Sequence, residues 1–128
     1  MRLLLDTHAL LWFSLDDPQL PASARSMIVD PGNKALISPA SYWELSIKVS
    51  TGKYQISSMF FRDLADQIDS GAFVLLPITT AHAEVVASLP FHHRDPFDRM
   101  LVAQAMVERV PILSADLALD AYPAARIW

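Results

Sequence analysis

The sequence predicts an α/β protein whose short, mainly parallel sheet is covered by helices on both faces. The apolar runs are too short to form helices, they do not alternate with polar residues, and helical patterns separate them. The chain of 128 residues has the length of one domain, so a single domain over residues 1–128 is expected.

Each strand is predicted from an apolar run and each helix from the residues that start and stop it. The expected strands cover residues 2–6, 34–38, 73–77 and 111–114, with a fifth at 125–128. The expected helices cover residues 8–15, 21–29, 40–51, 59–71, 80–89 and 98–110. Thr7 is the expected cap of the first helix, and Gly52 and Gly71 close two others. The strand at 73–77 is expected to be buried like the others.

Composition excludes several classes of protein. Without cysteine, the chain cannot form disulfides, a thiolate nucleophile or a Cys-ligated metal site. The net charge of −4 argues against binding to nucleic acid through bulk charge, so such contacts must be local. No apolar stretch reaches membrane-spanning length, and a soluble, cytoplasmic protein is expected.

Four acidic residues, Asp6, Glu44, Asp98 and Asp116, stand near the ends of predicted strands or the starts of the helices beside them. Ligands of parallel α/β sheets bind outside the carboxyl ends of the strands, so these acids are expected to converge there. Close carboxylates repel each other and need a cation, and a set of oxygen ligands favours Mg²⁺ or Mn²⁺. A divalent ion held this way suits phosphodiester hydrolysis.

Each acid also has a purely structural interpretation. Asp6 can stabilise a helix N-terminus, and Glu44 can pair with Lys48 on a solvated helix face. Asp98 can cap its helix, and Asp116 can cap a short segment at 117–120. None of these explains why all four acids fall on one side of the sheet.

Four segments together resemble a known family. They are DTHALLW at 6–12, SYWELSIK at 41–48, HHRDPFDRMLVAQA at 92–105 and ILSAD at 112–116. In order and spacing they look like the motifs of PIN-domain ribonucleases, specifically the VapC-like toxins of bacterial toxin–antitoxin pairs. The block HRDPFDRMLVAQA is the most specific of the four.

The resemblance implies a three-layer α/β/α fold, a Mg²⁺- or Mn²⁺-dependent endoribonuclease activity on RNA, inhibition by a cognate antitoxin, and a homodimer. It places the four family acids, which serve as catalytic residues and metal ligands, on Asp6, Glu44, Asp98 and Asp116. Asp95 is either an outer contact of the metal or a residue that orients a neighbouring arginine. Ser114 stands where the family usually has threonine.

Supporting and substrate-binding roles are expected around the acids. Thr7 and Ser114 are expected to support the site through their hydroxyl groups. Arg94, Arg99 and Lys48 are expected to grip RNA phosphates from a basic rim.

The histidines are assigned no metal. His92 and His93 flank the third acid, but as adjacent loop residues they lack the spacing of zinc ligands.

An apolar share of 52% suggests that some apolar surface meets a partner. The bulky aromatic residues expected to form it are Trp12, Phe13, Trp43, Phe60 and Phe61. In the resembling family this surface takes up an antitoxin segment, while core packing is the alternative for each aromatic residue.

Two other functions stay open from the sequence. A receiver-like phosphoacceptor domain fits poorly, because no acid precedes Asp6 and no lysine follows Lys53. A catalytically silent PIN-like binding module would keep the fold without cutting RNA, although all four acids are present.

Overall fold

Five short strands pair into one sheet in the computed structural model of the chain, which describes residues 1–128. The strands are β1 (Arg2–Leu5), β2 (Lys34–Ile37), β3 (Val74–Leu75), β4 (Ile112–Leu113) and β5 (Arg126–Ile127). Their order in the sheet is β3-β2-β1-β4-β5, and every pairing is parallel. The predicted parallel sheet is confirmed.

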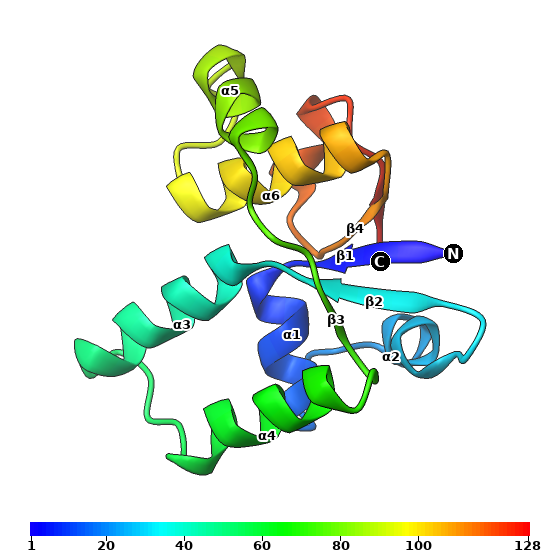
Figure 1. Ribbon diagram of the computed structural model, residues 1–128, viewed down its shortest axis with the longest axis vertical. Helices are drawn as coiled ribbons and strands as arrows, with labels where there is room; N and C mark the ends of the chain where they lie inside the picture. The colour runs from blue at the N-terminus through cyan, green and yellow to red at the C-terminus, as the bar shows by residue number, and fades with distance from the viewer.

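Helices cover both faces of this sheet. They are α1 (Thr7–Ser14), α2 (Ala22–Val29), α3 (Pro39–Ser50), α4 (Met59–Asp69), α5 (Thr80–Ser88) and α6 (Pro96–Glu108), with a 3₁₀ turn, η1 (Leu117–Ala121). Figure 1 shows α5 and α6 above the sheet, and α1, α2 and α4 below it. This is the expected three-layer α/β/α arrangement. No helix combines the length and apolar character needed to cross a bilayer.

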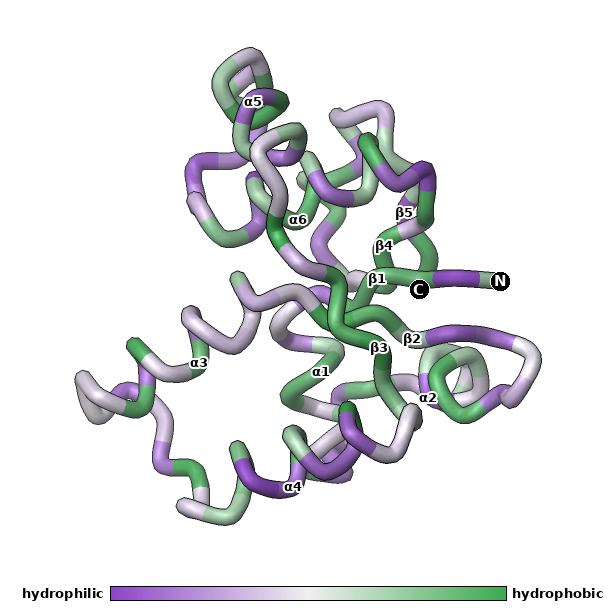
Figure 2. The backbone as a smooth tube through the Cα atoms, in the orientation of Figure 1, coloured by the Kyte–Doolittle hydropathy of each residue, from purple (hydrophilic) through white to green (hydrophobic).

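The inner strands β2, β1 and β4 have no polar face, because both faces of each are buried. Leu3 and Leu5 of β1 belong to a core cluster of 15 residues, whereas Leu4 belongs to a second cluster of 13. Figure 2 shows hydrophobic colouring along the strands between the two helical layers. Sheets covered on both faces produce the continuous apolar runs seen in the sequence.

The order of the strands creates a crevice beside β1. The chain runs outward from β1 through β2 to β3, then returns to β4 on the opposite side of β1. Where β1 and β4 pair, Leu5 lies opposite Leu113. The residues that follow them therefore meet at the topological switch point, where ligands of open α/β sheets bind.

One prediction about apolar residues is wrong, and for most of the aromatic residues core packing, the alternative interpretation, holds. Val74 and Leu75 are exposed rather than buried, because β3 is an edge strand, and only the flanking Phe73 and Leu76 enter the core. Most of the aromatic residues expected on a partner surface pack into the core instead: Trp12, Phe13, Phe60 and Phe61 lie in or against the first core cluster. Only Trp43 among those five is largely exposed, at 65%.

Candidate metal centre

Asp6 is held at the end of β1 by two backbone contacts. Its own N–H donates to Leu113 O (3.1 Å), and its Oδ1 accepts the Ala9 N–H (2.6 Å). Asp6 is therefore the cap of α1, and the prediction that Thr7 would be the cap is wrong by one residue. The Thr7 hydroxyl instead donates to Ser41 Oγ (3.1 Å), a buried link to α3.

Asp95 and Asp98 divide two roles at the start of α6. Asp95 Oδ1 accepts the N–H groups of Phe97 (2.9 Å) and Asp98 (3.0 Å), so Asp95 caps the helix. The helix starts at Pro96, two residues before the predicted start, because proline suits the first helical position. Asp98 consequently lies in the first turn with its side chain free of the capping role.

Asp116 follows β4 and caps η1, as the structural interpretation of this acid predicted. Its Oδ1 accepts the Ala118 N–H (3.0 Å), and its own N–H donates to Ser114 Oγ (3.0 Å). Ser114 also lowers the pKa of Asp6 through a hydrogen bond. The Ser114 hydroxyl thus connects the ends of β1 and β4.

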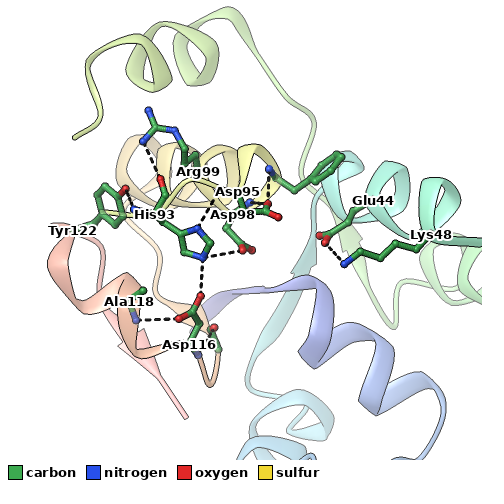
Figure 3. A network of polar contacts seen from close by, with 11 residues as sticks. Glu44, Lys48, His93, Asp95, Asp98, Arg99, Asp116, Ala118 and Tyr122 are labelled. Atoms are coloured by element: carbon green, nitrogen blue, oxygen red, sulfur yellow. Dashed lines mark hydrogen bonds and ion pairs between the residues drawn. The ribbon is translucent and has the colours of Figure 1, made fainter. Parts of the chain in front are cut away.

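Asp98 and Asp116 are joined by the imidazole of His93 (Figure 3). His93 Nε2 lies 2.8 Å from Asp116 Oδ2 and 3.1 Å from Asp98 Oδ2. One donor atom from each of the three side chains lies within 4.8 Å of the others. His93, Asp98 and Asp116 thus form a group of side chains whose donor atoms lie close enough together to hold a metal ion.

The electrostatic environment ties Asp6 and Glu44 to the same centre. Burial raises the pKa of Asp98 to about 7, and the negative charges of Asp95, Glu44 and Asp6 add to the rise, while His93 opposes it. Burial likewise raises the pKa of Asp6, and Asp116 contributes. Asp6 and Glu44 therefore act on Asp98, and Asp116 acts on Asp6, as expected of acids that converge at one edge of the sheet.

Glu44 is buried on α3 and pairs with Lys48 of the same helix. Lys48 Nζ lies 2.7 Å from Glu44 Oε2, and only 4% of Glu44 is exposed. The pair was predicted, but on a solvated helix face, which is wrong because α3 turns Glu44 toward the centre. Glu44 Oε1 is buried and has no hydrogen-bond partner.

The residues present fit a divalent cation. A buried carboxylate oxygen without a donor, such as Glu44 Oε1, is costly unless a cation or water satisfies it. Burial and neighbouring carboxylates raise the pKa of Asp6 and of Asp98, and a bound cation would favour the charged forms of both. The oxygen-rich donor set suits Mg²⁺ or Mn²⁺, and the residues that could hold the ion are Asp6, Glu44, Asp98 and Asp116.

Arg99 does not belong to the basic rim, so its predicted contact with phosphate is wrong. Only 5% of the residue is exposed, and its guanidinium donates to four backbone carbonyls between residues 86 and 93. The guanidinium carbon also lies 4.0 Å from the centre of the Phe91 ring. Arg99 is buried because it lies on α6, whose whole central stretch is covered.

The other two predicted rim residues differ in how free they are. Lys48 is held by Glu44 and lies 5.2 Å from the centre of the Tyr54 ring. Arg94 is exposed and takes part in none of the ion pairs. Arg94 therefore remains the rim cation best placed to meet a phosphate.

The position of His93 between two acids could not be predicted from its place beside the third acid in the sequence. Ligand spacing within one helix was the criterion, and a loop histidine that reaches acids from distant segments does not satisfy it. The available signal was its position two residues before the cap of α6, in the most specific of the quoted motifs.

The raised pKa of Asp98 predicts that, in chelator, the protein loses stability as pH rises. The folded state holds a proton up to pH about 7 that the unfolded state releases near pH 3.8. The contribution of Asp98 to the free energy of unfolding should therefore be complete below pH about 4. It should be lost as the pH rises through about 7. Urea unfolding in chelator between about pH 5 and pH 8 measures it, with Asp98→Asn as the variant whose slope is reduced. A rise in stability over this interval would contradict the expectation.

Comparison with known proteins agrees with the fold and the motifs. The family model of the PIN domain matches residues 3–125. One chain of the crystal structure of VapBC2 from Rickettsia felis, bound to a DNA fragment from its promoter, superposes with a TM-score of 0.75 at 13% identity, covering 99% of this chain and 98% of that one. A chain of FitAcB from Neisseria gonorrhoeae gives a TM-score of 0.67 at 18% identity, covering 98% and 96%. No curated protein matches the sequence significantly. Since the family model spans nearly the whole chain, this protein belongs to the PIN domain family.

Proposed function

We propose that this protein is a Mg²⁺- or Mn²⁺-dependent endoribonuclease and the toxin of a toxin–antitoxin pair. The observation that carries the proposal is the arrangement of carboxylates at the switch point between β1 and β4, where burial and neighbouring carboxylates raise the pKa of Asp98 and of Asp6. Membership of the PIN family supports nuclease chemistry at this place.

The chain's own residues can be assigned roles in hydrolysis. Asp6 and Asp98 would hold the cation most directly, and Glu44 and Asp116 would complete the set of ligands and orient water. When bound, the divalent ion supplies charge neutralisation for the phosphodiester and lowers the pKa of water. One of the carboxylates takes the proton from the attacking water.

Substrate contacts come from the exposed side of the centre. Arg94 stands two residues after an exposed His92 and next to His93, on the loop that borders the acids. Its free guanidinium can bind a phosphate beside the one being cut. Lys48 contributes by holding the Glu44 carboxylate through their 2.7 Å ion pair rather than by reaching RNA.

The toxin assignment rests on the motifs and on the structural similarity to VapBC2 and FitAcB. A cognate antitoxin is the proposed protein partner, and Trp43 is an exposed aromatic contact for it. We also propose a homodimer, which light scattering of the purified chain tests directly.

Asp6→Asn is expected to abolish RNA cleavage while the fold is retained, because asparagine can still cap α1 but carries no charge for the cation. Cleavage of a mixed RNA substrate with Mg²⁺, with Mn²⁺ and with chelator is the measurement. Asp63→Asn, at an exposed position on α4, serves as the matched control and should cut like the wild type.

Two results would contradict the proposal. Equal cleavage in chelator would exclude a role for the cation. Binding of Mn²⁺ without any cleavage of RNA would indicate a silent PIN-like module instead.

A further inference from the structure

His93 is placed at the acidic centre by a loop, not by a strand or a helix. Its Nε2 lies 3.1 Å from Oδ2 of Asp98 and 2.8 Å from Oδ2 of Asp116. Figure 3 shows the ring lying between the two carboxylates. No other side chain bridges acids from α6 and from the segment after β4 in this way.

The hydrogen bonds of His93 define which ring nitrogen carries the proton. The backbone N–H of Asp95 donates to Nδ1 at 3.1 Å. A backbone N–H can only donate, so Nδ1 must present its lone pair and the proton of the neutral ring must lie on Nε2. Nε2 therefore donates its proton to Asp116 Oδ2 at 2.8 Å, with Asp98 Oδ2 beside it at 3.1 Å, and offers no lone pair to a cation. The imidazole occupies the position of a hydrogen-bond donor, not of a metal ligand.

The loop that carries His93 is fixed by two buried side chains. Tyr122 Oη donates to Pro90 O (2.7 Å) and accepts the His93 N–H (2.9 Å). Arg99 donates to Pro90 O (2.9 Å) and to His93 O (3.4 Å). Because Tyr122 and Arg99 are both buried, the imidazole is presented from a rigid support.

From this geometry we propose that His93 is a positioning residue that fixes the separation and orientation of Asp98 and Asp116 for the divalent cation. His93 Nε2 hydrogen-bonds to Asp116 Oδ2 and lies 3.1 Å from Oδ2 of Asp98, which leaves the other oxygen of the Asp98 carboxylate for the ion. Partners that hydrogen-bond to metal ligands in this way typically change metal affinity about 10–100-fold when they are removed. This inference rests on the cation-binding part of the proposed function, and not on RNA cleavage.

The test is Mn²⁺ affinity, measured without RNA by electron paramagnetic resonance of the free ion. His93→Ala is expected to weaken binding by about 10–100-fold. His93→Gln should restore most of the affinity, because its amide can donate near the position of Nε2 while its nitrogen cannot ligate a metal. Asp63→Asn, at an exposed position on α4, is the control and should bind Mn²⁺ like the wild type. His92 is unsuitable as a control because its ring packs against Tyr122, with 5.1 Å between the ring centres.

Two further measurements separate positioning from ligation and from misfolding. Pulsed resonance of the Mn²⁺-loaded wild type should show no directly coordinated ¹⁴N. Tyr122→Phe, which removes the hydroxyl that joins Pro90 to His93, should weaken Mn²⁺ binding without altering any acid. If His93→Ala does not fold, the Gln variant and Tyr122→Phe still decide the matter.

The outcomes are distinct from those of the cleavage experiment. A direct ¹⁴N coupling, an unchanged affinity in His93→Ala, or a wild type that binds no Mn²⁺ would each overturn the positioning role. A wild type that binds Mn²⁺ tightly but leaves RNA intact would overturn the proposed ribonuclease and leave the role of His93 standing.

Discussion

Arg99→Ala is expected to lower the free energy of unfolding by about 3 kcal/mol. The variant removes the only donor to Leu89 O and His93 O, at 3.2 and 3.4 Å. Val86 O and Pro90 O each keep a second donor. A buried carbonyl without a partner costs about 1–3 kcal/mol. Leu89 O is buried and His93 O is partly buried, and their cost is partly offset because no guanidinium then has to be desolvated.

Arg94→Ala provides the control for this expectation. Arg94 has the same side chain, lies five positions earlier and is exposed, so its removal should change stability by less than about 0.5 kcal/mol. Chemical denaturation of both variants in parallel is the measurement. Equal stability of the two variants would contradict the assignment of Arg99 as the clamp of this loop.

Asp98→Asn is expected to lower cation affinity and RNA cleavage by at least about 100-fold, because a direct ligand should matter more than an outer partner. The same variant should be at least as stable as the wild type in chelator at neutral pH. Burial raises the pKa of the Asp98 carboxyl to about 7, which shows that its charge is disfavoured there, and the amide carries none. Activity and stability are thus expected to move in opposite directions.

Asp95→Asn is the matched comparison for this variant. Asparagine caps helices about as well as aspartate, so the hydrogen bonds from Phe97 and Asp98 should survive and stability should change little. Cation affinity should remain within a few-fold of the wild type. A loss as large as that of Asp98→Asn would mean that Asp95 contacts the cation directly.

The strands and the acids that follow them could be predicted because neighbouring residues in the sequence determine where each strand begins and ends. The run before Asp6 is short and wholly apolar, which identifies a strand buried on both faces. The parallel topology then requires residues after β1 and β4 to meet. Nothing beyond the chain's own pattern is needed for this step.

The roles of individual polar side chains could not be predicted, because they depend on contacts between distant segments. Arg94 and Arg99 are chemically identical, and only the packing of α6 against the loop makes one exposed and the other buried. Asp6 and Thr7 are both good caps, and the choice follows from where β1 stops pairing with β4. The bridge from His93 to Asp116 joins residues that sequence spacing does not relate.

Asp6 and Asp116 serve both as helix caps and as proposed cation ligands, which affects the entropy of cation binding. Asp6 and Asp116 each commit Oδ1 to a backbone N–H, at 2.6 and 3.0 Å, so both side chains lose their rotational freedom when the chain folds. An ion then meets carboxylates that are already oriented, and little further freedom is lost on binding. Replacing Asp6 or Asp116 with alanine would remove a helix cap together with a ligand. Replacement with asparagine removes the charge alone and is therefore the better way to inactivate this centre.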